Sequence, residues 1–242
     1  MAVTLSTLDF ITGLFSFLVL IVGAIIGLSI AARYFKYKSK LYLYWGIAYM
    51  GFYCPWWPSG ISFISVIITG QPISPFMYLL LGHILIPFLM IIWILGLTEM
   101  IYQNKRKILI IIYSIIPGAA EIILIYALIT DVSLLITFDG IFSVTFNRLW
   151  LIYLLFISFS VAITGLLFAR DSLRSDDREI RFKGKALIIA FLTYPIVSII
   201  DGGLELNALG VILIRSILMF GAVMFYIGFF VPKFFKKIFK LE

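Results

Sequence analysis

Long apolar stretches alternate with short polar segments along the whole chain. The stretch from Leu14 to Ala32 is typical, because only Ser16 and Ser29 interrupt its apolar and small residues. A helix needs roughly 20 apolar residues to cross a bilayer, whereas the strands of a membrane barrel are shorter and alternate apolar with polar residues. The pattern therefore predicts an all-α, polytopic membrane protein, a single domain of residues 1–242 that forms a seven-transmembrane helix bundle. The predicted spans are residues 9–33, 41–68, 75–101, 107–130, 143–169, 186–206 and 208–231.

Lysines and arginines are almost confined to alternate connections between the predicted spans. Of the 19 basic residues, 17 fall in the segments 33–40, 105–107, 170–185 and 233–240. The other connections carry acidic residues, Asp131, Asp139 and Glu205. Connections rich in lysine and arginine stay in the cytoplasm. We therefore expect a multi-pass protein of the cell membrane, with its N-terminus outside, its C-terminus in the cytoplasm and an odd number of spans.

The composition limits the functions open to the chain. It is 63% hydrophobic and 13% charged, and seven crossings leave no length for a soluble catalytic domain. The net charge of +7 belongs to the topology signal, so we expect the lipid bilayer as a partner and no nucleic acid. Motifs of the Gly-x-Ser-x-Gly, His-Glu-x-x-His, Walker and Cys-x-x-Cys types are missing, which disfavours an enzyme and a metal site.

Two charged residues lie inside the last two predicted spans, where an ionisable group is costly and therefore a functional candidate. Asp201 and Arg215 each lie five to seven residues inside the outer end of their span. Because the two helices are antiparallel and joined by a short turn, the charges fall at similar depth, and we expect them to form an ion pair. This pair is either a packing device or part of a ligand site.

Two further polar residues are candidates on weaker grounds. Glu121 lies near the middle of the fourth predicted span, after Pro117 and Gly118, where a disturbed helix turn gives room for water or a partner. His83 is the only histidine, and one histidine without a second ligand does not support a transition-metal site. We expect it to be a hydrogen-bonded interior residue, or a proton-sensitive element where it faces Asp201 or Glu121.

The second predicted span contains the sequence Cys-Pro-Trp-Trp-Pro-Ser-Gly at residues 54–60. Pro55 and Pro58 remove two backbone donors and predict a kink or an unwound turn, which a membrane tolerates only against other helices or a cavity. Trp56 and Trp57 either stack on a flat apolar ligand, pack around the kink or belong to an interfacial belt.

The last third of the chain resembles microbial rhodopsins. The likeness rests on short motifs in the last three predicted spans: Arg148-Leu149-Trp150, Tyr194-Pro195, Gly202-Gly203, Ser216 and Gly221. The resemblance adds Tyr194 to the candidate ligand-binding residues. It aligns Met219 with the lysine that holds retinal in rhodopsins, and Arg215 with the counter-ion aspartate. It therefore implies an opsin-like scaffold for which covalent retinal is excluded and a non-covalent apolar ligand stays open as a cofactor.

Three functions remain open. The leading hypothesis is a non-enzymatic receptor or sensor that binds a small or lipidic ligand in an outer-half cavity near His83, Asp201, Arg215 and the proline kink. The alternatives are a small transporter or channel that uses Glu121, Asp201 and Arg215, and a structural or accessory subunit. A cavity reaching both sides favours transport, a closed inner half favours the receptor, and a solid interior favours the structural role.

A receptor of this size needs a separate cytoplasmic or membrane signalling partner. The connection 170–185 mixes basic residues with Asp171, Asp176, Asp177 and Glu179. It is either a solvated helical extension with local ion pairs or a docking surface for that partner. The sequence is also compatible with an oligomer and does not decide between oligomeric states.

Overall fold

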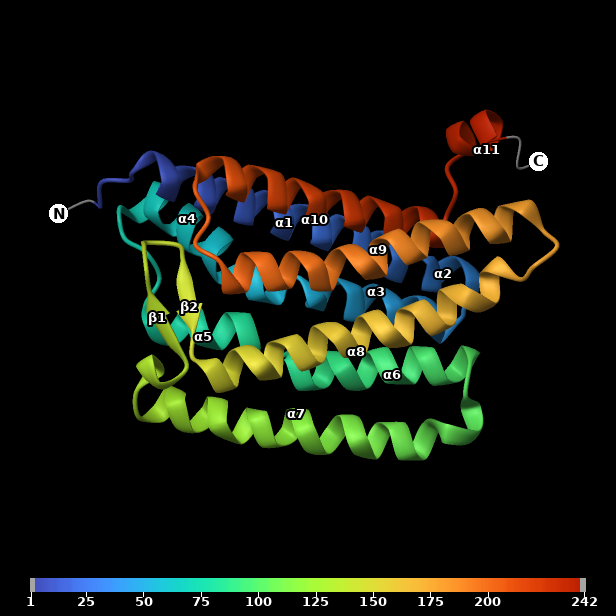
Figure 1. The fold of residues 1–242 in the computed structure, drawn as a ribbon, viewed down its shortest axis with the longest axis horizontal. Coiled ribbons are helices and arrows are strands. Elements are labelled where there is room, and N and C mark those ends of the chain that lie inside the picture. The colour runs from blue at the N-terminus through green and yellow to red at the C-terminus, as the bar shows by residue number, and fades with distance from the viewer. Residues whose placement is uncertain (1–2, 240–242) are drawn as a thin grey trace.

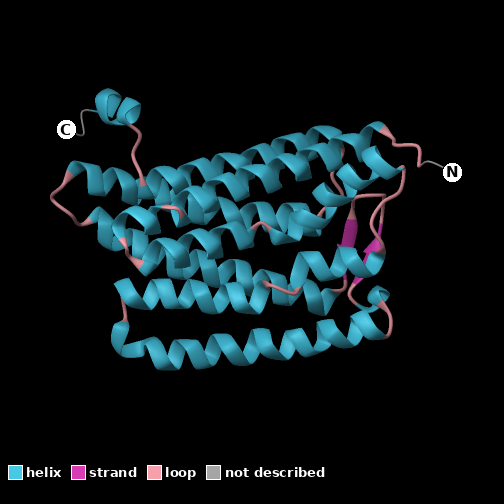
Figure 2. Cartoon of the chain, turned by 180° about the vertical axis from the view of Figure 1, so that it is seen from behind, coloured by secondary structure: helices cyan, strands magenta, loops and turns pink. Residues whose placement is uncertain are grey.

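The computed structural model describes residues 3–239 of the chain and shows a bundle of helices with one small sheet (Figures 1 and 2). The elements are α1 (Thr7–Ala31), α2 (Arg33–Tyr37), α3 (Lys40–Phe52), η1 (Cys54–Trp56), α4 (Trp57–Thr69), α5 (Pro75–His83), α6 (Ile86–Met100), η2 (Gln103–Lys105), α7 (Arg106–Ile129), η3 (Val132–Leu134), β1 (Ile136–Phe138), β2 (Val144–Phe146), α8 (Arg148–Leu173), α9 (Arg178–Gly203), α10 (Ala208–Phe229) and α11 (Lys233–Phe239).

Six helical segments in the described part of the chain are long and apolar enough to cross a membrane. The stretch predicted as the second span, 41–68, is not one of them. It is divided into α3 and α4, which have 13 residues each, and neither alone has the length of a bilayer crossing. The protein is therefore a helical multi-pass membrane protein in which one predicted span is a broken helix.

The break in that span lies at the prolines. Pro55 follows Cys54, the first residue of η1, and Pro58 lies in the first turn of α4. Neither proline has an amide hydrogen for a helical bond. The amide of Trp56 instead donates to the carbonyl of Tyr53 over 3.0 Å, which tightens the chain into a short 3₁₀ turn.

A β-hairpin precedes α8, where only a loop and the start of a helix were expected. Strands β1 and β2 are antiparallel, with Ile136 opposite Phe146 and Phe138 opposite Val144. Helix α8 consequently begins at Arg148 rather than at residue 143, and Asn147 caps it by accepting a hydrogen bond from the amide of Leu149 over 3.1 Å. Apart from this short hairpin, the described part of the chain is all-α, as predicted.

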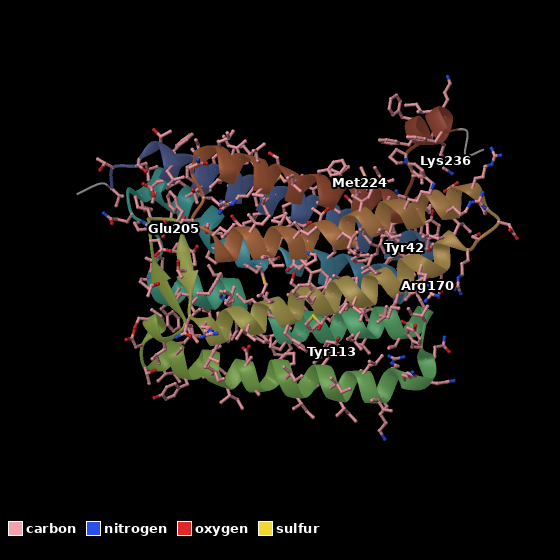
Figure 3. All side chains as sticks on the ribbon, viewed as in Figure 1. Tyr42, Tyr113, Arg170, Glu205, Met224 and Lys236 are labelled. Atoms are coloured by element: carbon pink, nitrogen blue, oxygen red, sulfur yellow. The ribbon has the colours of Figure 1, made fainter. Side chains whose placement is uncertain are left out.

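The two ends of the bundle differ in composition, and we name them by what they carry. The hairpin end holds β1, β2 and the α9–α10 connection, whereas the basic end holds α2, the α8–α9 turn and α11 (Figure 1). Figure 3 places Glu205 at the hairpin end and Arg170 and Lys236 at the basic end. At the basic end, Glu179 pairs with Lys183 over 2.7 Å and with Lys236 over 2.5 Å. Lys240, predicted to be cytoplasmic, lies outside the described residues.

Small residues allow α1 to pack closely against α3 and α4. A Cβ atom added to Gly46 of α3 would lie 2.5 Å from the backbone nitrogen of Ala31 and 2.5 Å from the carbonyl oxygen of Gly27. One added to Gly60 of α4 would lie 2.9 Å from the Cα of Phe17. Close backbone approach at small residues is the usual way in which membrane helices pack, because lipid offers no hydrophobic driving force between them.

Aromatic side chains fill the part of the bundle toward the basic end. Trp45 and Trp93 are 1% exposed and meet edge to face, with ring centroids 4.4 Å apart. Tyr49 stacks on Phe225 at 3.7 Å. The outer surface is apolar as well: on the peripheral helix α7, Ile115 is 64% and Ile129 77% exposed. Such a surface is stable in contact with lipid and would cause aggregation in water.

Candidate functional site

A cavity of about 820 Å³ lies in the half of the bundle next to the hairpin. Its wall is formed by η1, parts of α1, α3, α4, α5, α6, α8, α9 and α10, the hairpin and the α9–α10 connection. Its deep part reaches Phe52 and Met90, and it reaches the surface at the exposed residues Leu204 and Glu205. A volume of roughly 300–1,000 Å³ is typical of sites for small organic ligands.

Asp201, Arg215 and Trp56 meet in the wall of this cavity. The Nε atom of Arg215 lies 3.6 Å from Oδ1 of Asp201, so the expected ion pair is present, and the two side chains are 7% and 11% exposed. The indole Nε1 of Trp56 donates to Oδ2 of Asp201 over 2.5 Å. The proline-kinked turn is thereby tied to α9, because Trp56 belongs to η1 and Asp201 to the last turn of α9.

Helix α1 holds the other side of the arginine. Nη1 of Arg215 donates to the carbonyl of Thr12 and to Oγ of Ser16, over 2.5 Å in each case. Thr12 and Ser16 are four residues apart and therefore share one helix face. Sequence reasoning missed both, although Ser16 is one of only two polar interruptions in the stretch 14–32. A serine inside an apolar helix, on the face of a second small polar residue, is the signal that was available.

Tyr194 lines the cavity and completes the hydrogen bonding of the broken helix. In a regular helix the carbonyl of Phe52 would accept from the amide of Trp56. That amide is turned to Tyr53, and the hydroxyl of Tyr194 donates to the Phe52 carbonyl over 2.9 Å instead. A backbone carbonyl freed inside a membrane needs such a partner. The kink is therefore linked to α9 by two hydrogen bonds, one from Tyr194 and one to Asp201.

The hairpin closes one side of the cavity and is fixed by its loop. The carbonyl of Phe142 accepts from Oγ of Ser59 over 2.8 Å and from the hydroxyl of Tyr78 over 3.2 Å. The side chain of Phe142 is 1% exposed. The amide of Ile141 donates to Oδ1 of Asp9 over 3.3 Å. These contacts join residues that are far apart in the chain, and no pattern in the sequence predicts them.

The remaining sequence candidates lie outside the cavity lining, except for Pro55, which belongs to it. His83 is buried, its Nδ1 is 3.1 Å from the Leu79 carbonyl, and its ring contacts Phe146 and Trp150. The structure gives it no contact with Asp201 or Glu121. Glu121 is half-buried on the peripheral helix α7 and has no hydrogen bond or ion pair with the described residues. Trp57 and Pro58 are the first two residues of α4 and follow the lining residue Trp56 in the chain, but they do not line the cavity themselves.

The arrangement is suited to binding. Within residues 3–239, no three histidine, cysteine, aspartate or glutamate side chains gather as a metal site would require. In the described part of the chain, four charged residues line the cavity: Asp139, Asp201, Glu205 and Arg215. The rest of the wall is mainly apolar and aromatic, with a few hydroxyl groups. An apolar pocket with a few fixed polar groups is the usual design of a small-molecule site.

Comparisons with known proteins add no relative. No family model, no curated protein and no solved structure matches the chain. The resemblance to microbial rhodopsins therefore has no support from any relative, and the assignment of function depends on the cavity and its surroundings.

Proposed function

We propose that this protein is a seven-transmembrane receptor or sensor of the cell membrane, which binds a small ligand in the cavity at the hairpin end and signals to a separate partner at the basic end. The observation that carries the proposal is the contrast between the two halves of the bundle. One half contains a ligand-sized cavity. The other is filled by packed aromatic side chains around Trp45 and Trp93.

The proposal takes α3, η1 and α4 together as the seventh crossing. The two helices are consecutive, and both pack against the spanning helix α1. With this crossing, the 17 basic residues of the four basic connections fall on one side of the membrane. The positive-inside rule then makes the basic end cytoplasmic and the hairpin end, with the cavity, external. The N-terminus is outside and the C-terminus inside.

The closed half favours a receptor over a transporter or channel. A transported polar solute needs a route past the basic end, with polar groups to replace its water. Below the cavity, Phe52 and Phe191 each contact the ring of Trp93. The pocket beside these rings, lined by residues that include Tyr49, Phe191 and Phe225, holds only about 10 Å³. A purely structural subunit, for its part, gains nothing from a cavity of about 820 Å³.

The signal route in this proposal is the link between the kink and α9. Trp56 and Tyr194 line the cavity, and each bonds across the interface between η1 or α3 and α9. A ligand in contact with these side chains changes the position of α9 relative to α3. Helix α9 continues to Arg178 at the basic end, where the segment 174–185 presents charged side chains to a partner.

The experiment is a binding measurement with a defined probe, 2-(naphthalen-1-yl)ethanol, on protein in lipid nanodiscs, with empty nanodiscs as the blank. We expect saturable binding to the wild type and its loss in Leu155→Trp, which adds an indole to the cavity wall. The matched control is Leu167→Trp, on the outer surface of the same helix, which should bind as the wild type does. Equal binding by both variants would refute the cavity as the site.

Signalling is tested on the same samples by amide hydrogen exchange. Bound probe should change the exchange of residues 174–185, because α9 connects them to the cavity. A change limited to the residues around the cavity would contradict the receptor role and leave only a binding protein. The matched Leu155→Trp variant should show no change in either region.

A further inference from the structure

We infer that the ligand is an amphipathic organic cation, whose ammonium group is bound by carboxylates and whose apolar body fills the aromatic interior. This inference depends on the proposed function, because it names the class of molecule for the same cavity. It is drawn from the charges in the wall, from two polar atoms left without hydrogen bonds, and from the aromatic lining.

The charged residues of the wall do not balance. Three carboxylates, those of Asp139, Asp201 and Glu205, face a single cation, the guanidinium of Arg215. Among residues 3–239, no lysine and no second arginine lines the cavity. The wall therefore has two negative charges in excess. In a cleft with low-dielectric walls such an excess attracts cations and repels anions.

Each partner of the Asp201–Arg215 pair has one polar atom that makes no hydrogen bond. Oδ2 of Asp201 is taken by Trp56, but Oδ1 is 3.6 Å from Nε of Arg215, longer than a hydrogen bond. Nε of Arg215 is buried and has no hydrogen-bond partner. Buried polar atoms are rarely left in this state unless water or a ligand supplies the partner. Oδ1 suits an ammonium donor, and Nε suits a hydroxyl or carbonyl oxygen next to it.

The surroundings of the arginine disfavour an anionic ligand. Thr12 and Ser16 hold its Nη1 on the side of α1, and Asp201 compensates its charge from the other side. A carboxylate ligand would have to approach Asp201 as well, and would pass Asp139 and Glu205 on the way. Repulsion between like charges is strong in a partly desolvated site, so these carboxylates oppose the entry of a carboxylate ligand.

The mouth of the cavity carries the two remaining carboxylates. Glu205 and Asp139 are exposed, and they come from the α9–α10 connection and from the hairpin, respectively. Figure 3 shows Glu205 at the hairpin end of the bundle, beside the strands. Exposed carboxylates contribute to the encounter with a cation more than to its final affinity. They therefore steer an ammonium group toward Asp201.

The interior fits the rest of such a molecule. Six aromatic side chains line the cavity: Phe52, Trp56, Tyr78, Phe142, Phe146 and Tyr194. Aromatic faces attract an ammonium group and also pack well against flat apolar rings. The deeper wall is aliphatic, with Leu89, Met90 and Ile157, and suits a hydrocarbon body.

The test compares three probes of nearly the same shape: 2-(naphthalen-1-yl)ethylammonium, 2-(naphthalen-1-yl)ethanol and 3-(naphthalen-1-yl)propanoate. Binding to wild-type protein in zwitterionic nanodiscs should be at least about tenfold tighter for the ammonium than for the alcohol, and weakest for the carboxylate. Glu205→Gln and Asp139→Asn should each weaken the ammonium about two- to fivefold, as expected for partly exposed charges. Neither should change binding of the alcohol.

The matched control is Asp131→Asn. Asp131 is an exposed carboxylate of the same end of the bundle that does not line the cavity. Hydrogen bonds from Ser133 lower its pKa, so it is charged at neutral pH and its removal changes the net charge as the two test variants do. An equal effect of all three variants would show that general surface charge, rather than the mouth of the cavity, attracts the probe.

The outcomes separate this inference from the proposed function. Equal affinity for ammonium and alcohol, with both lost in Leu155→Trp, would overturn the cation and leave the cavity as a binding site. Preference for the propanoate would overturn it in favour of Arg215 as the anchor. Binding of none of the probes would remove the proposed function together with the inference.

Discussion

Arg215 joins several elements in the hairpin half of the bundle. It is 6% exposed, and it connects α10 to α1 through Thr12 and Ser16 and to α9 through Asp201. A buried guanidinium is stable only when its charge and its donors are matched. One side chain thus joins three helices through polar contacts.

The first prediction concerns the ion pair between Asp201 and Arg215. Asp201→Asn and Arg215→Gln should each lower the free energy of unfolding by about 3–5 kcal/mol, because each leaves a buried charge without its partner. The double variant should lose clearly less than the sum of the two, as coupled residues do in a double-mutant cycle. The measurement is denaturation in mixed micelles. Arg148→Gln, an exposed arginine of the same end, is the control and should change little. Additive losses would show that the pair is not coupled.

The second prediction concerns lysine. No lysine lies between Ala186 and Val231, and none lines the cavity. All-trans-retinal added to the purified protein should therefore give no red-shifted Schiff-base absorption and no adduct after borohydride reduction. Met219, which the rhodopsin resemblance aligns with the retinal lysine, offers no amine. A stable reducible pigment would contradict both the resemblance-based alignment and the placement of the lysines.

At the residue scale, the sequence predicted the charges and missed their neighbours. The contact between Asp201 and Arg215 followed from equal depth on two consecutive antiparallel helices, which is a local argument. The bonds from Arg215 to Thr12 and Ser16 cross about 200 residues of chain. They depend on how α1 packs against α10, and the period of apolar residues does not determine helix neighbours. His83 and Glu121 were selected because burying an ionisable side chain in a membrane is costly. That cost does not show whether the side chain faces the cavity.

At the element scale, α1 is the helix against which the broken span is assembled. It contacts α3, η1, α4 and α10, and Gly27 and Gly46 bring its backbone against that of α3. Because α3 and α4 are short, neither is a stable crossing by itself, and the contact with α1 compensates for the break at Pro55. The glycines are therefore part of what makes the kink tolerable.

The third prediction tests this contact. Gly46→Ala places a Cβ 2.5 Å from the backbone of α1, so the helices must separate, at a cost of about 1–3 kcal/mol. Gly118→Ala is the control in α7, because a Cβ there meets nothing within 4 Å and alanine is the better helix former. Thermal unfolding in detergent should show a lower midpoint for the first variant and an unchanged or higher midpoint for the second. Equal midpoints would show that the crossing can relax.

The elements show where pattern reading works and where it fails. Long helices were located well, because about 20 apolar residues in lipid have few alternatives to a helix. The hairpin at 136–146 was missed, since its strands have three residues each and produce no usable alternation. Its position depends on Phe142 and on the hydroxyls of Ser59 and Tyr78, which are contacts of the finished fold.

At the scale of the whole molecule, charge and internal packing are both asymmetric along the bundle axis. The packed aromatic side chains share one end with the basic connections, and the cavity shares the other with the acidic loops. Figure 3 shows Arg170 and Lys236 at the first end and Glu205 at the second. An asymmetry of this kind has a simple physical use. Basic loops fix the orientation in the membrane, and that orientation decides to which compartment the cavity opens.

The fourth prediction tests that orientation. Single cysteines are introduced at Ser133, at the hairpin end, and at Asp176, in the α8–α9 turn, both of which are exposed. A membrane-impermeant maleimide should label Ser133→Cys in intact cells and Asp176→Cys only after permeabilisation, because basic connections are retained in the cytoplasm. The wild type is the background control, since its only cysteine, Cys54, is buried. The reverse labelling pattern would turn the cavity toward the cytoplasm and with it the source of any ligand. Labelling of both positions in intact cells would mean that α8, which lies between them in the chain, does not place them on opposite sides of the membrane, and would refute the proposed topology.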